Sequence, residues 1–246
     1  MYQLLCYSIL IVIYLVYQYI RWRSYYSISE NILINIGSII LFALLLLLSV
    51  FYFDIHSLVI KPDLLNKYGL LGYNYNISWY TLITSNYIHS DYTHLFFNII
   101  ALIIISSIED TCGSIVFLLM FIFPSILSSL IIMIILPDNS IALGASTGIS
   151  SLYSIIVAEN LLIDNLPVSL PTSSKIQEFI LGIGMIFIVT FLLSFGRTSL
   201  PTNNNILPFS FHLIGATMGY LLYVMIKYLF PNTFKYLVIW GNGNGA

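Results

Sequence analysis

The sequence predicts an all-α membrane protein that crosses the bilayer several times. Hydrophobic residues make up 59% of the 246 positions and charged residues only 7%, whereas soluble domains carry about 25% charged residues. The mean hydropathy is +0.95. Apolar runs long enough to span a bilayer, ~20 residues, recur along the whole chain. The predicted core is therefore the interior of a lipid bilayer rather than a water-excluded globule.

The rest of the composition narrows the class of protein. The net charge is −2, and no basic patch indicates a nucleic-acid partner. Cys6 and Cys112 are too few for a disulfide framework. The helix order also places them near opposite faces of the membrane, so we predict that they do not pair.

The first apolar run, Leu4 to Ile20, carries no charge and is followed by Arg21-Trp22-Arg23, as is typical of an interfacial anchor. A cleaved signal peptide is the alternative, but the run lacks a basic start and an obvious small-residue cleavage site. We therefore predict a retained helix. Residues 1–30 then form an extra N-terminal transmembrane helix with a basic loop.

Six further spans are predicted to form a membrane domain over residues 31–232. The connection from Asp54 to Ser90 is rich in Tyr, Asn and Gly and too long for a tight turn, so we expect a partly embedded segment with short helical pieces. Residues 233–246 read as a disordered tail. The six spans are expected at about Ile34–Phe53, Tyr92–Ile108, Ser114–Leu136, Gly144–Val157 (extending to Ile163), Ile176–Phe195 and Ile206–Phe230.

Counting the spans gives a relative topology. The third, fifth and seventh helices all begin on one face of the membrane. His94 and Asn98, Ser146, and His212 lie near those three helix starts, so we expect them to lie on the same side. The bias of Lys and Arg between the two faces is weak, so the absolute orientation stays open.

Polar and ionisable groups inside a membrane are expensive and are functional by default. His94 and Asn98 are four residues apart and share a helix face. Ser146 sits in Gly144-Ala-Ser-Thr-Gly148, where small neighbours allow a backbone or a substrate to approach closely. A lone Gly-x-Ser in an apolar chain usually indicates helix packing. A functional role for Ser146 is therefore inferred from the histidines and the asparagine that accompany it.

Together these side chains could hydrolyse a peptide bond. Ser146 could be the nucleophile and His212 its base across a helix interface. His94 and Asn98 could donate to the developing oxyanion together with the Ser146 backbone N–H. No acidic residue is placed to orient His212, so the sequence predicts a dyad rather than a triad.

Two stripes of small residues fit this arrangement. One stripe continues from Ser146 every four residues along the fifth helix, and Gly215 and Gly219 form the other below His212. Small residues at this spacing let membrane helices approach closely. Ordinary packing would explain both stripes, but not why a serine and a histidine head them on the same side.

Three stretches resemble motifs of the rhomboid family of intramembrane serine proteases. The stretch from His89 to Asn98 is similar to the family's His-x-x-x-x-His-Leu-x-x-Asn pattern. Gly144-Ala-Ser-Thr is similar to its Gly-x-Ser-Gly, and the stretch from His212 to Gly219 to its His-x-x-Gly-x-x-x-Gly. The resemblance covers about Ile34 to Phe230.

The resemblance implies a six-helix core with a shorter serine-bearing helix in the middle, preceded here by the extra N-terminal helix. It implies substrates that are single-span membrane proteins, cut near the face at which the site opens, and no cofactor. The residue roles it implies are Ser146 as nucleophile, His212 as general base, His94 and Asn98 as oxyanion groups, His89 as a scaffold residue that hydrogen-bonds the long connection, and Gly144, Gly215 and Gly219 as supporting residues.

The chain departs from the family pattern at four positions. Thr147 stands in place of the usual glycine after the serine, and a β-branched residue stiffens that turn. Tyr80 stands where many members have an arginine that holds the long connection. Phe211 replaces a small residue, and Ser150 stands where some members place an aromatic ring against the catalytic histidine.

Other classes of protein stay open. An inactive rhomboid-like protein would bind membrane clients without needing Ser146 or His212. A transporter or channel would show internal repeats, and none is found. A metalloprotease would be expected to contain His-Glu-x-x-His, and the sequence has no such motif. No Cys or Asp lies at ligand spacing to complete a metal site with the histidines.

The expected partners are transmembrane protein substrates and the lipid bilayer, with no metal and no nucleic acid. We expect a multi-pass integral membrane protein of the cell membrane, with an organelle membrane as the open alternative. The loop Gly196 to Asn205, which lies above the expected site, is rich in Asn and contains Pro201. We expect it to act as a mobile lid.

Overall fold

The structure is a computed structural model that describes residues 2–25, 36–54, 57, 59–72, 78–136, 140–162 and 206–229. The predicted span Ile176–Phe195, the predicted lid Gly196–Asn205 and the tail 233–246 lie outside these residues. The elements are α1 Tyr2–Tyr25, α2 Ile36–Tyr52, α3 Pro62–Tyr68, β1 Leu70–Leu71, α4 Thr81–Thr84, α5 Tyr92–Ile105, the 3-10 turn η1 Ser106–Ile108, α6 Glu109–Ile135, β2 Ile141–Ala142, α7 Ser146–Leu162 and α9 Ile206–Leu229.

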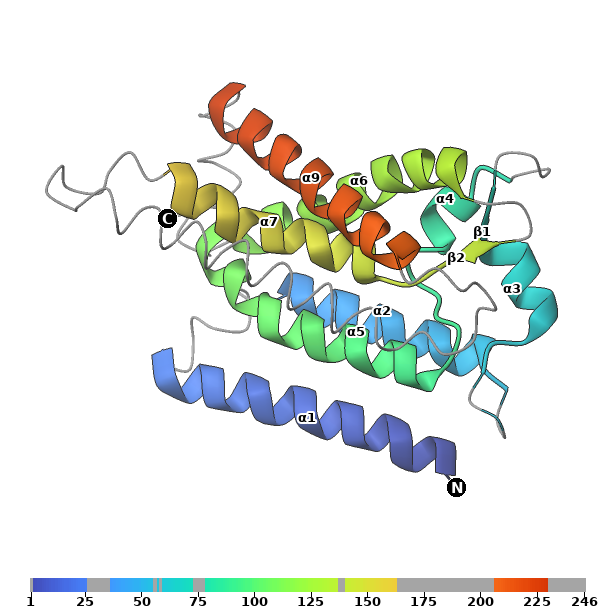
Figure 1. The fold of residues 1–246 in the computed structure, drawn as a ribbon. Helices are drawn as coiled ribbons and strands as arrows, with labels where there is room; N and C mark the ends of the chain where they lie inside the picture. The colour runs from blue at the N-terminus through green and yellow to red at the C-terminus, as the bar shows by residue number, and fades with distance from the viewer. Residues whose placement is uncertain are drawn as a thin grey trace, which may run out of the picture.

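The long helices lie side by side in a bundle, with α1 at its edge next to α5 (Figure 1). The short elements α3, α4, β1 and β2 gather at one end of this bundle. Helices α1, α5, α7 and α9 all begin at that end, while α2 and α6 run the opposite way. This confirms the expectation that the third, fifth and seventh helices begin on one side.

The mainly helical fold is confirmed, and the arrangement of six core helices plus one stays a prediction. The observed bounds of α2 and α9 differ from the predicted ones by at most two residues. Helix α1 extends beyond the predicted Ile20 to Tyr25. The cysteines Cys6 and Cys112 are both free, as predicted.

A short antiparallel pair of strands was not predicted from the sequence. Leu70 of β1 pairs with Ala142 of β2, and Leu71 pairs with Ile141. Two-residue strands are too short to show the alternation by which a strand is recognised. The pair joins the long connection after α2 to the segment that leads into α7.

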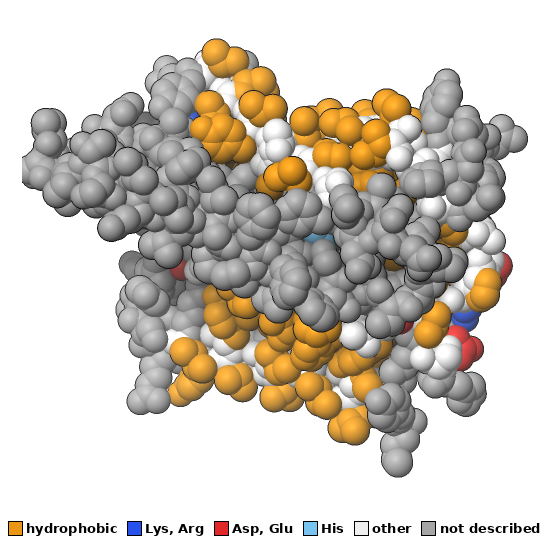
Figure 2. All heavy atoms as spheres, viewed as in Figure 1, with side chains coloured by type: hydrophobic (Ala, Val, Ile, Leu, Met, Phe, Trp, Pro, Cys, Tyr) orange, Lys and Arg blue, Asp and Glu red, His pale blue; other side chains and the backbone are white. Residues whose placement is uncertain are grey.

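The surface that faces the viewer in Figure 2 is largely apolar over the described parts of α1, α5, α6 and α9, and a group of charged side chains lies at the right of the view, over α3. Among the described helices, α6 contains a run, Cys112–Ile135, that is long and apolar enough to cross a membrane. Shorter apolar helices occur at Leu5–Ile20, Ile36–Tyr52 and Tyr92–Ile108.

Glu109 ties the start of α2 to the turn between α5 and α6. Its side chain is fully buried. One carboxylate oxygen accepts the Gly37 N–H at 2.7 Å and the Ser114 hydroxyl at 2.5 Å, and the other accepts the Ser38 N–H at 3.0 Å. The first N–H groups of a helix have no partner within it, and a negative charge there is favourable. The carboxylate therefore caps α2 from a distant part of the chain.

We predict that Glu109→Gln destabilises the protein. The amide keeps one acceptor but turns an N–H group toward the N–H groups of α2, so we expect the free energy of unfolding to fall by about 3 kcal/mol. Reversible unfolding by sodium dodecyl sulfate in mixed micelles measures it. The control Ser114→Ala removes a single donor to this carboxylate and should cost about 1 kcal/mol. A Glu109→Gln protein as stable as wild type would refute the capping role.

Candidate active site

The start of α5 is fixed by a capping residue. Asp91 has extended backbone angles, and its Oδ1 accepts the backbone N–H of His94 at 2.9 Å. The Ser90 hydroxyl donates to Asp91 Oδ2 at 2.7 Å and lies 3.3 Å from His94 Nδ1. Aspartate is among the preferred N-cap residues. The cap and the Ser90 contact together hold the His94 ring in place.

Asn98 lies one turn further along the same face of α5 and is fully buried. Its side-chain N–H₂ group donates to the His94 carbonyl at 2.8 Å. An amide has two N–H donors, so this bond leaves one donor for another acceptor. Its Oδ1 has no hydrogen-bond partner within the described residues.

The segment before Ser146 lies directly against the His94 ring. Gly144 has φ of +116°, and a Cβ there would be 2.6 Å from His94 Cε1 and 2.7 Å from Nε2. Both the backbone angle and the contact demand glycine. The Gly144 N–H donates to the Ser85 carbonyl at 2.8 Å. The structure therefore brings His94 to the backbone two residues before Ser146.

His89 supports the same segment from the long connection. Its Nε2 accepts the Ala145 N–H at 3.4 Å, and its ring lies edge-on to the His94 ring with 5.0 Å between centroids. The residue lies between α4 and α5, and burial lowers its pKa to about 3. The ring is therefore neutral at physiological pH, as an acceptor at Nε2 requires.

Helices α7 and α9 approach closely where the small residues lie. Helix α9 packs mainly on α7. A Cβ added to Gly215 would collide with the Thr147 carbonyl, and one at Gly219 would lie 2.6 Å from the Ser151 carbonyl. His212 precedes Gly215 by three residues and Ser146 immediately precedes Thr147. The contact therefore places the Ser146 and His212 ends of the two helices together, and both side chains are at most 2% exposed.

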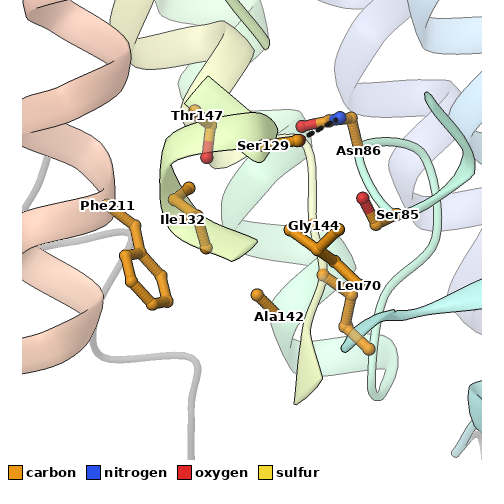
Figure 3. A pocket seen from close by; sticks show the side chains of 10 residues that line it. Leu70, Ser85, Asn86, Ser129, Ile132, Ala142, Gly144, Thr147 and Phe211 are labelled. Atoms are coloured by element: carbon orange, nitrogen blue, oxygen red, sulfur yellow. Dashed lines mark hydrogen bonds between the residues drawn. The ribbon is translucent and has the colours of Figure 1, made fainter. Parts of the chain in front are cut away.

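A recess opens beside these residues (Figure 3). Gly144 and Thr147, which precede and follow Ser146 in the sequence, line the recess. Phe211, the residue before His212, lines it from α9. A hydrogen bond of 3.0 Å from the Asn86 amide to the Ser129 hydroxyl joins two of its lining residues. The remaining lining residues are Leu70, Ser85, Ile132, Ala142 and Leu143. The recess therefore has a mixed polar and apolar wall.

The sequence did not single out Ser85, Ser90 or Asp91 as part of this cluster. Asp91 could have been found, since an aspartate just before an apolar helical run is an N-cap signal. Ser85 acts through its backbone carbonyl, which leaves no mark in the sequence. Within the described parts of the chain, no group of three or more His, Cys, Asp or Glu side chains could hold a metal ion.

Comparison with known protein families identifies the family of this chain. The fold is that of a helical membrane protein with a serine, an asparagine and histidines buried at one end of its bundle. Residues 76–229 match the sequence model of the Rhomboid domain. The match covers more than half of the chain, so the protein belongs to the rhomboid family and is an integral membrane protein. Searches of curated proteins and of solved structures gave no significant match.

The matched range is narrower than the resemblance expected from Ile34 onward. It includes α4 to α9, and therefore every residue of the three motifs, but it leaves out α1, α2 and α3. The family comprises intramembrane serine proteases and inactive relatives.

We predict that Gly215→Ala separates α7 from α9. The added methyl group would collide with the Thr147 carbonyl, and overpacking of this kind costs about 1–3 kcal/mol. Thr217→Ala, on an exposed position of the same helix, is the control and should change stability by less than about 0.5 kcal/mol. Thermal unfolding in detergent compares the two variants. Equal melting temperatures for both would contradict the close contact.

We also predict that His89 makes stability depend on pH. The unfolded chain binds a proton at His89 below its ordinary pKa of 6.5, whereas the folded protein does so only near 3. Folding stability is therefore lost as pH falls through this window, by about 1.4 kcal/mol per unit. His89→Gln offers an acceptor near the Nε2 position but does not titrate there. Melting curves at several pH values should show that wild type loses more stability than His89→Gln below pH 6.5, and parallel curves would contradict this account.

Proposed function

We propose that the protein is an intramembrane serine endopeptidase that cleaves peptide bonds in or near transmembrane segments of membrane proteins. The observation that carries the proposal is the cluster at one end of the bundle. There His94 lies against Gly144, Asn98 lies one turn away, and the α7–α9 contact brings together the helix ends that bear Ser146 and His212.

In this mechanism His212 takes the proton of the Ser146 hydroxyl, and the Oγ attacks the carbonyl carbon of the scissile bond. The carbonyl oxygen becomes an oxyanion that accepts hydrogen bonds from Asn98, His94 and the Ser146 N–H. His212 then gives the proton to the leaving amine. In the second half of the reaction His212 takes a proton from a water molecule, and the water oxygen attacks the carbonyl carbon of the acyl-enzyme. The bond to Ser146 Oγ then breaks, His212 returns the proton to Oγ, and the carboxylic acid product leaves.

The buried environment supports the oxyanion role of Asn98. Its amide is held by the His94 carbonyl, so one N–H points in a fixed direction without reorganisation during the reaction. Fixed donors in a site without bulk water stabilise developing charge more than water does. Removal of one such donor typically costs about 10²–10³ in rate.

The recess beside Ser146 supports the substrate class. A peptide bonded to Ser146 places the side chain next to the scissile carbonyl close to Gly144 and Thr147, which line the recess. An intact helix hides its carbonyls in its own hydrogen bonds. We therefore expect substrates that unwind locally at helix-breaking residues, in the cell membrane.

The competing function is that of an inactive relative that binds membrane clients. Thr147, which replaces the glycine of the family pattern, lies at the α7–α9 contact and lines the recess, where a β-branched side chain would crowd a substrate. The reactivity of Ser146 therefore distinguishes the protease from the inactive relative.

The test is labelling by a fluorescent fluorophosphonate in detergent and in liposomes. Ser146 Oγ would form a bond to phosphorus, fluoride would leave, and His212 would take the proton. We expect wild type to be labelled, Ser146→Ala and His212→Ala to lose the label, and Asn98→Ala to react about 10²–10³ times more slowly. The control Ser154→Ala removes a buried hydroxyl two turns further along α7 and should react as wild type does. Folded wild type that takes no label in either environment would support the inactive relative.

A further inference from the structure

The N-terminal helix α1 packs on the rest of the bundle between Cys6 and Tyr17. Tyr7, Leu10 and Tyr14 are buried and, with Tyr17, follow spacings of three and four residues that form one helix face. Tyr14 stacks on Phe42 of α2 with 3.9 Å between ring centroids. Near the far end, the Tyr17 hydroxyl accepts a hydrogen bond of 3.4 Å from Ser106. Helix α1 therefore runs beside α5 and in the same direction (Figure 1).

At the end where the candidate site lies, the contact is made by Tyr92, the first residue of α5. Its hydroxyl donates to the backbone carbonyl of Cys6 at 2.7 Å. Its ring lies edge-on to Tyr7, with 6.2 Å between centroids. A helix carbonyl has a second lone pair that can accept such a bond. A hydroxyl without a partner in apolar surroundings is costly, so this bond holds Tyr92 to α1.

Tyr92 belongs to the helix turn that carries the proposed oxyanion donors. His94 follows it by two residues, and the His94 carbonyl holds the Asn98 amide. On the side of the connecting segment, Asp91 and Ser90 fix this turn. On the side of α1, Tyr92 fixes it. The first turn of α5 is thus held between two independent supports.

We propose that Tyr92 is a positioning residue for the oxyanion site. Helix α1 supports this site through its contact with Tyr92. The Tyr92–Cys6 bond sets the position of the first turn of α5 and, through the His94 carbonyl that holds the Asn98 amide, the position of Asn98. This inference rests on the proposed protease function. Oxyanion donors act only within a narrow distance range, and a displacement of about 1 Å in an active site can cost 10²-fold in rate.

The test compares two removals of one oxygen atom. Tyr92→Phe keeps the ring and loses the bond to Cys6. Tyr7→Phe is the matched control, since its hydroxyl is buried in the same ring pair and has no hydrogen-bond partner within the described residues. Fluorophosphonate labelling gives a maximal rate and a half-saturating probe concentration for each variant. We expect Tyr92→Phe to lower the maximal rate about 3- to 10-fold with unchanged half-saturation, and Tyr7→Phe to leave both unchanged.

A second arm separates positioning from general weakening of the fold. If Tyr92 acts through Asn98, the loss caused by Tyr92→Phe should shrink to less than about 2-fold when Asn98→Ala is already present. The same loss in both backgrounds, or no loss at all in a wild type that does react, overturns the role of Tyr92 and leaves the protease proposal standing. A folded wild type that does not react overturns both.

Discussion

At Gly215 the backbone of α9 comes so close to the carbonyl of Thr147 that one methyl group would collide with it. A second contact of the same kind follows one turn later, between Gly219 and Ser151. Lipid offers little hydrophobic driving force between helices, so such close backbone contact is what holds them together. The relative position of the two helix starts, and with it the separation of Ser146 from His212, depends on this pair of contacts.

Three polar side chains complete hydrogen bonds that helices and loops leave open. Glu109 caps α2, Asp91 caps α5, and His89 accepts an N–H from the segment before α7. In a bilayer no water is at hand for such groups, so side chains from other elements must supply the partners. The bonds of Asp91 and His89 also hold His94 and the segment before Ser146, so stability and site geometry are linked at that end of the bundle.

The sequence predicted those features that depend on local periodicity and on spacing. The apolar runs predicted the bounds of the described helices to within a few residues, and counting the runs predicted the common side for His94, Ser146 and His212. It could not predict contacts that depend on where a backbone atom ends up, such as Gly144 against the His94 ring or Tyr92 on the Cys6 carbonyl. Backbone carbonyls are identical in every residue, so an acceptor of this kind has no signature in the sequence.

The β1–β2 pair has a consequence for any exchange of segments between related proteins. Leu70 and Leu71 form their ladder with the two residues that stand just ahead of the Gly144 segment. The connection after α2 therefore positions the segment that precedes Ser146 through the backbone pairing of β1 with β2. A chimera that takes this connection from a relative must also take the matching strand before α7, since each half was shaped to the register of the other.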